Sequence, residues 1–192
     1  MATKAGLTRT AVLEAAAALA DEHGLDALTL AALAARLGVT TPTLYHYFPG
    51  LAGLRRELAL LGLRDLEVTL GRAVMGRAGA DALRALADAY RAYVNEHPGL
   101  YAATVRAVPE DAELAAAQTR VVEIALRALD AYHLSPDDAI HAVRMLRSIT
   151  HGFATIEVAG GFGIPLAVDE TFRRLVGGIL STLDANTNRK DA

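Results

Sequence analysis

The chain has 192 residues, a formal net charge of −3 and no cysteine, and this length suffices for one well-packed domain or for a small module joined to a larger one. Without cysteine there is no disulfide, no thiolate nucleophile and no cysteine-ligated zinc, so a cytoplasmic location is expected. The negative charge argues against a non-specific nucleic-acid coat, and no uncharged apolar run approaches the length of a membrane span, so no membrane partner is expected.

The predicted fold is all-α, because apolar residues recur with helical spacing and the segments between them are short runs of Gly, Pro, Asp and Ser. Thr8, Thr29 and Thr40 are expected to begin the first three helices, and Gly38 to end the second. In chain order, the expected helices cover residues 8–23, 30–37, 40–48, 51–74, 80–96, 100–108, 110–132, 135–158 and 169–183.

The second and third expected helices form a helix-turn-helix in spacing and chemistry, since Gly38 permits a tight turn and Val39 can fill the space between them. Their apolar residues can pack against the first helix. The other side of the stretch GVTTPTLYHYFPG offers hydroxyl groups, a ring nitrogen and methyl groups, which can meet phosphate oxygens and base edges in a major groove. The alternative is that these aromatic side chains only complete a core. The outward candidates are Thr40, Thr41, Thr43, Tyr45, His46 and Tyr47.

The run LTLAALAARLGVTTPTLYHYF resembles the DNA-binding domain of the TetR family of transcriptional regulators. The resemblance implies that Thr29 touches phosphate at a helix N-terminus and that Tyr45 and His46 reach phosphates or bases. Family members often carry a lysine after the recognition helix, where this chain has Pro49-Gly50-Leu51, so either Arg55 or Arg56 would substitute or the affinity for DNA would be lower. Residues 1–56 carry a slight excess of basic residues, in keeping with an anion-binding face. The candidates for contact with a double-stranded DNA operator are Thr29, Arg36, Thr40, Thr41, Thr43, Tyr45, His46, Tyr47 and Arg55.

The C-terminal run RSITHGFATIEVAGGFGIPLAVDETFRRLV is similar to the WHG group of TetR-like C-terminal domains, named for a Trp, a His and a Gly. His151-Gly152 is present, but the chain has no Trp. The resemblance implies a domain that binds an effector and dimerises. The expected organisation is a helix-turn-helix domain at residues 1–50, a larger helical effector-binding and dimerisation domain at 51–186, and a flexible tail at 187–192.

Two further sets of residues are predicted in the C-terminal part. Side chains with apolar bodies and polar tips suit a pocket for a small organic effector, although core packing is the alternative for each: Tyr90, Tyr93, His97, Tyr101, His141, Met145 and His151. The apolar stripes of the last two helices appear too broad for one neighbour and predict a two-fold four-helix bundle, with closure of the monomer core as the alternative. The predicted dimer residues are Leu146, Ile149, Gly152, Phe153, Ile156, Phe172, Val176, Ile179, Leu180 and Leu183.

Two carboxylate-x-x-His pairs, Asp130-x-x-His133 and Asp138-x-x-His141, have the spacing found in metal-bearing bundles. Both lie beside the break at Ser135-Pro136, and Asp137 and Asp138 are explained more simply as first-turn acids on a helix dipole. We therefore expect no metal, no cofactor and no catalytic residue. The sequence predicts a homodimeric transcriptional regulator, acting as a repressor on a palindromic operator and released by a small-molecule effector. The alternative is a helical small-molecule carrier or metal-dependent bundle enzyme that does not bind DNA.

Overall fold

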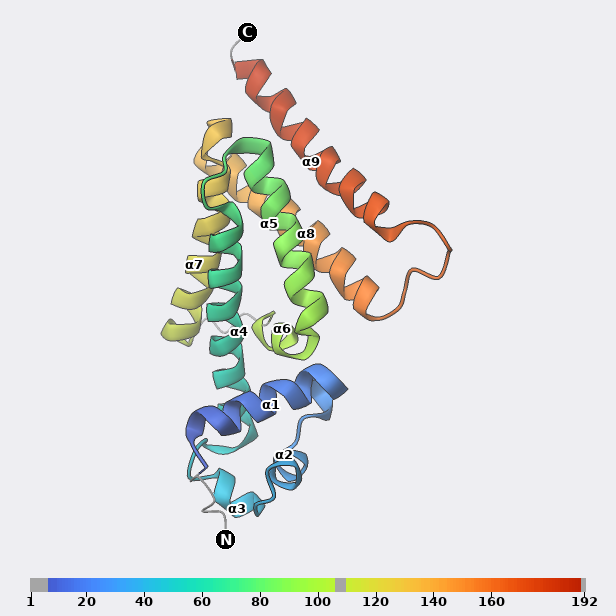
Figure 1. The fold of residues 1–192 in the computed structure, drawn as a ribbon. Coiled ribbons are helices and arrows are strands. Elements are labelled where there is room, and N and C mark those ends of the chain that lie inside the picture. The colour runs from blue at the N-terminus through green and yellow to red at the C-terminus, as the bar shows by residue number, and fades with distance from the viewer. Residues whose placement is uncertain (1–6, 106–109, 191–192) are drawn as a thin grey trace. The chain divides into compact units, whose positions relative to one another are not determined.

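The computed structural model describes residues 7–105 and 110–190, and it confirms the all-α fold, with no strand in those ranges (Figure 1). The last side chain described is that of Ala185. The described α-helices are α1 (Arg9–His23), α2 (Leu30–Leu37), α3 (Thr41–Leu44), α4 (Gly50–Val74), α5 (Gly79–Glu96), α6 (Pro98–Thr104), α7 (Ala112–Ala128), α8 (Pro136–Val158) and α9 (Val168–Lys190). Two short 3₁₀ helices, η1 (Leu25–Ala27) and η2 (Asp130–Tyr132), follow α1 and α7.

Four helix boundaries differ from the prediction. The third helix is α-helical only over Thr41–Leu44, since the next three amides bond to carbonyls three residues back, as in a 3₁₀ turn. α6 begins at Pro98 instead of residue 100, and the predicted continuation over 106–108 lies outside the described residues. α7 ends at Ala128 instead of residue 132, because the chain tightens into η2 and His133 then turns left-handed with φ 48°.

The fourth difference is at the C-terminus, where α9 continues past the predicted end at Leu183 to Lys190. No Gly or Pro follows Gly178, so nothing in the local sequence stops the helix. The predicted flexible tail at 187–192 is therefore helical as far as Lys190, and its last two residues lie outside the described part of the chain.

The chain divides into two compact units. Unit 1 comprises residues up to Arg64 together with His97–Leu114, and unit 2 comprises Asp65–Glu96 together with the residues from Ala115 onward. These units differ from the predicted domains at 1–50 and 51–186, because α6, far along the chain, packs against α1. The functional boundary at residue 50 stays a prediction.

Unit 1 is built around one apolar cluster that joins α1, α2, α3, the first half of α4 and α6. α6 lies very close to α1: a Cβ added at Gly99 would stand 2.0 Å from the carbonyl oxygen of Ala20. The carboxylate of Asp21 then accepts a hydrogen bond from the backbone N–H of Leu100 at 2.7 Å and lies 3.3 Å from Nδ1 of His97. The buried cluster consists of Val12, Ala16, Ala17, Leu19, Leu28, Leu33, Ala34, Leu44, Phe48, Leu54, Leu58 and Leu100.

Unit 2 packs α5, α8 and α9 against one another. Its polar centre is Arg91 on α5, whose guanidinium lies 5.1 Å from the ring centroid of Phe153 and 4.9 Å from that of Phe172. The same guanidinium binds both carboxylate oxygens of Glu157, at 2.8 and 2.5 Å, and one oxygen of Asp169 at 2.8 Å. One arginine therefore connects the three helices by ionic and cation–π contacts.

Candidate nucleic-acid interface

The turn between α2 and α3 is fixed by backbone hydrogen bonds that its sequence makes possible. The hydroxyl oxygen of Thr29 accepts from the backbone N–H of Ala32 at 3.1 Å, which caps α2 as predicted. At the other end Gly38 is left-handed, with φ 66°, and its N–H bonds to Ala35 while that of Val39 bonds to Ala34. This pair of bonds is a Schellman motif, which accounts for the glycine.

The segment after this turn has one side buried in unit 1. Leu44 and Phe48 are 1% and 2% exposed, and both belong to the apolar cluster of that unit. Four residues of α-helix are not stable by themselves, so the packing of these two side chains has to hold the segment in place.

The other side of the segment carries exposed polar groups. The side chain of Tyr45 is 59% exposed, and Thr40 and His46 are also exposed. The hydroxyl groups of Thr40 and Thr43 lie 3.0 Å apart. A phenol, an imidazole and hydroxyls on a firmly packed segment can donate to phosphate oxygens and meet base edges.

The remaining candidates of this segment are half-buried, namely Thr41, Thr43 and Tyr47. The hydroxyl of Tyr47 donates to the backbone carbonyl of Leu7 at 2.8 Å and so holds the residues before α1. The prediction that Tyr47 points outward is wrong, because its ring packs against the core of unit 1.

The cations of this region are engaged within unit 1. Arg36 donates to both carboxylate oxygens of Glu22, at 2.6 and 2.7 Å, which raises the pKa of Arg36 and lowers that of Glu22. Arg9 pairs with Glu57 at 2.9 Å and lies over the ring of Phe48. Arg9 was not among the predicted candidates, and its position directly after the N-cap Thr8 carries no local signal of a binding role.

Arg55, predicted to contact DNA, is half-buried and donates from Nη2 to the backbone carbonyl of Leu25 at 3.2 Å. Its Nε is buried without a hydrogen-bond partner. This guanidinium is engaged by the protein's own backbone, which does not support its predicted role as a phosphate anchor.

The predicted effector residues are not brought together as one set. His97 and Tyr101 belong to unit 1, whereas the other five belong to unit 2. Tyr90 and Tyr93 are buried on α5, and His151 is half-buried on α8, where burial, followed by the charge of Arg147, lowers its pKa. His141 and Met145 are exposed on α8, so their place in a closed pocket is not supported.

The predicted dimer residues also divide. Seven of them are less than 9% exposed and pack between the helices of unit 2, so they cannot form an outer surface: Leu146, Phe153, Phe172, Val176, Ile179, Leu180 and Leu183. The apolar stripe is the inner face of α8 and α9. Ile149 and Gly152 are half-buried, and Ile156 is 47% exposed.

The alternative of a metal-dependent bundle gains no support. In residues 7–105 and 110–190, no three side chains of His, Asp or Glu are grouped so that they could hold a metal ion. None of the helices in the same ranges combines the length and apolar character needed to cross a lipid bilayer.

Comparison with known proteins supports the helix-turn-helix interpretation. Residues 12–58 match the family of bacterial regulatory proteins of the tetR type, and residues 83–179 match a tetracycline repressor-like C-terminal domain. The HTH-type transcriptional regulator Rv0681 of Mycobacterium tuberculosis is 36% identical over 163 residues, which cover 83% of this chain and 74% of that protein. YobS of Bacillus subtilis, also an HTH-type transcriptional regulator, is 35% identical over 156 residues, 81% of this chain and 82% of that protein.

Solved structures share the fold. A protein of unknown function from Rhodococcus sp. RHA1 has a TM-score of 0.78 at 25% identity, covering 93% of this chain and 96% of that one. A variant of TetR from Acinetobacter baumannii AYE, in complex with minocycline, has a TM-score of 0.73 at 22% identity, covering 95% and 99%. The sequence matches favour a DNA-binding regulator over a carrier or an enzyme, and the chain belongs to the TetR family of transcriptional regulators.

Proposed function

We propose that this regulator is a repressor that binds a palindromic operator as a homodimer and is released by a small organic effector. The observation that carries the proposal is the two-sided segment after Gly38: Leu44 and Phe48 are locked in the core, while Tyr45 is 59% exposed. A short segment held in this way can enter a major groove without losing its shape.

The charge pattern indicates how DNA would be bound. Between residues 7 and 50 the chain has two arginines and no lysine, and both arginines are in ion pairs. The pair between Arg36 and Glu22 is exposed and contributes little stability, so a phosphate can replace that carboxylate. Hydroxyl and backbone N–H donors would supply the remaining phosphate contacts, and the salt dependence of binding would be shallow.

The outer faces of α8 and α9 supply a surface for a second copy, and dimers are typical of the family. On α8, Met145 and Ile156 are 41% and 47% exposed, and Leu175 on α9 is 40% exposed. A Cβ added at Gly152 or Gly178 would meet nothing within 4 Å, so these positions leave room for a closely approaching helix. The proposed interface therefore uses the faces that flank the buried stripes.

The effector is proposed to bind in unit 2, with Tyr90, Tyr93 and His151 as the retained candidates. They combine apolar surface with polar tips, which suits a small organic molecule. Minocycline in the related structure is such a molecule, but its identity does not transfer at 22% identity. Release would follow if the effector favours dimers whose recognition segments no longer match the spacing of the half-sites.

The operator is tested with pseudo-palindromic DNA from upstream of the gene, by fluorescence anisotropy. We expect Tyr45→Ala to weaken binding about tenfold or more, since one good base contact is worth about 1–3 kcal/mol. The control is Leu166→Ala, at a side chain that is 75% exposed in unit 2. Equal affinity of Tyr45→Ala and the wild type would remove this side of the segment from the interface.

The dimer is tested by sedimentation. Ile156→Glu should give monomers and lower operator affinity, because a carboxylate would be buried against the partner. Met75→Glu, at a side chain that is 75% exposed, is the matched control and should remain dimeric. A dimer that persists in Ile156→Glu would contradict the proposed interface.

A further inference from the structure

Unit 1 contains a cavity that is lined by Arg55 and Arg56 but by none of the other predicted site residues. Its volume is about 840 Å³, within the range of pockets that hold small organic molecules. η1, the first half of α4, α6 and the start of α7 form its walls. Most of the lining is apolar and includes Leu25, Ala27, Ala59, Ala102, Ala103 and Leu114.

Arg55 lines this cavity, and the hydrogen-bonding capacity of its guanidinium is only partly satisfied. Nη2 of its guanidinium donates to the carbonyl of Leu25, but Nε is buried with no partner. Within residues 7–105 and 110–185, no carboxylate lies within 4.0 Å of this guanidinium. A half-buried cation with an unpaired N–H is costly unless an anion or another acceptor joins it.

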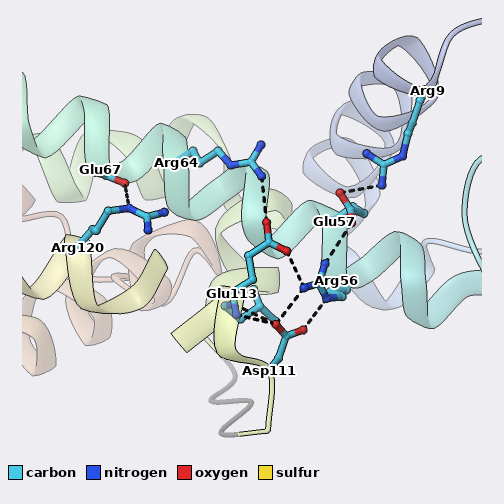
Figure 2. A network of polar contacts seen from close by, with 9 residues as sticks. Arg9, Arg56, Glu57, Arg64, Glu67, Asp111, Glu113 and Arg120 are labelled. Carbon is cyan, nitrogen blue, oxygen red and sulfur yellow. Dashed lines mark hydrogen bonds and ion pairs between the residues drawn. The ribbon is translucent and has the colours of Figure 1, made fainter. Parts of the chain in front are cut away.

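The other central charges of the cavity are already matched. Figure 2 shows Arg56 between Asp111 and Glu113, and its Nε and Nη2 donate to Asp111 at 2.5 and 2.9 Å. Asp111 also accepts from the backbone N–H groups of Glu113 and Leu114 at 3.2 and 3.1 Å. Two further polar side chains, His23 and Asp26, are exposed and stand at the rim. Arg55 is therefore the group available to a ligand.

We propose that this cavity binds an amphipathic organic carboxylate. Its carboxylate accepts hydrogen bonds from the guanidinium of Arg55, and its hydrocarbon part lies against the alanine and leucine side chains of the walls. Burial of the hydrocarbon supplies affinity, and the charge-assisted hydrogen bond selects an anion over a neutral analogue. The site is separate from the effector pocket proposed in unit 2.

The test uses the full chain and two probes that differ only in the head group, octanoate and 1-octanol, with binding measured by calorimetry. We expect octanoate to bind about tenfold or more tightly than octanol, the usual size of one charge-assisted hydrogen bond. Arg55→Met should bind both probes equally. Arg64→Met is the matched control, because Arg64 lies on the same helix outside the cavity and is 56% exposed; it should behave as the wild type.

Two further measurements test the proposal even if Arg55→Met fails to fold. Ala102→Phe places a ring in the cavity from an exposed position and should abolish octanoate binding. In the wild type, methyl NMR of labelled alanines should show octanoate-induced shifts at Ala27, Ala59 and Ala103. No binding, equal binding of the two probes, or shifts confined to alanines of unit 2 would each overturn the proposal. All these readouts are independent of DNA, so they can fail while the proposed repressor function stands.

Discussion

The two units use arginine in opposite ways. In unit 1 the core is apolar, and Arg36 forms an exposed ion pair with Glu22. In unit 2, Arg91 is only 15% exposed, and its guanidinium pairs with Glu157 and lies against two aromatic rings. Surface pairs contribute little and can be exchanged for other partners, whereas a desolvated pair cannot lose one member without a large cost. Exposure therefore distinguishes arginines that are available for binding from arginines that the fold requires.

The largest expected effect tests how tightly unit 1 is packed. Gly99→Ala should destabilise the protein by about 3 kcal/mol, because the new methyl group would meet the backbone of Ala20 at 2.0 Å and backbone cannot give way cheaply. Urea unfolding followed by circular dichroism measures this. Gly163→Ala, where an added Cβ meets nothing within 4 Å, is the control and should change stability little.

The next effect tests the buried pair of unit 2. Arg91→Met should cost about 2 kcal/mol at neutral pH, since Glu157 would lose its counter-ion in a mostly buried site. Arg120→Met removes the more exposed pair with Glu67 and should cost clearly less. If both variants lose the same stability, burial is not what distinguishes the pairs.

The stability difference between the wild type and Arg91→Met should depend on pH in one direction. Hydrogen bonds from Arg91, followed by one from Asn95, lower the pKa of Glu157 in the folded state, although desolvation opposes them. A lowered carboxyl pKa gives stability that is present above the unfolded pKa of about 4.3 and is lost as the pH falls through the folded value. The stability gap between wild type and Arg91→Met should stay constant from pH 7 to 5 and shrink below about pH 4.3. Denaturation at pH 3.5, 5 and 7 checks this.

A smaller effect tests the role of Tyr47 in unit 1. Tyr47→Phe removes the hydrogen bond to Leu7 and should cost about 1 kcal/mol of stability. If that hydroxyl is structural, operator affinity should change much less than in Tyr45→Ala. Tyr45→Phe is the matched control, since Tyr45 is 59% exposed and its loss of a hydroxyl should leave stability unchanged.

The smallest effect on stability tests whether the surface pairs are exchangeable. Glu22→Gln removes the carboxylate that holds Arg36, and no measurable change in unfolding is expected for so exposed a pair. Operator affinity should rise a few-fold, and the slope of log affinity against log salt should steepen by up to about one phosphate contact. Unchanged affinity and slope would mean that Arg36 does not reach DNA.

The sequence predicted the features that local chemistry determines. The N-caps at Thr8 and Thr29 and the left-handed Gly38 follow from short-range hydrogen bonding, and the structure has all three. The buried sides of Leu33, Leu44 and Phe48 follow from helical spacing. The family match to residues 12–58 agrees with the predicted helix-turn-helix.

The sequence did not predict which segment packs on a given apolar helix face. The stripe containing Leu146 and Phe153 was correctly read as buried, but periodicity does not tell whether the covering helix belongs to the same chain or to a partner. The inward course of Arg55 and the junction between Gly99 and Ala20 depend on contacts between distant segments, which no local pattern encodes.

The contribution of α6 to unit 1 has a consequence for folding. Asp21 and Leu100, joined by a hydrogen bond, are 79 residues apart in the chain, and Leu100 belongs to the same buried cluster as Val12. During synthesis the N-terminal helices therefore emerge before the segment that completes their core, and closing such a long loop slows folding. A fragment ending at residue 50 or 64 would lack α6 and leave apolar surface of α1 exposed. The helix-turn-helix should therefore reach its stable fold only after α6 has been synthesised.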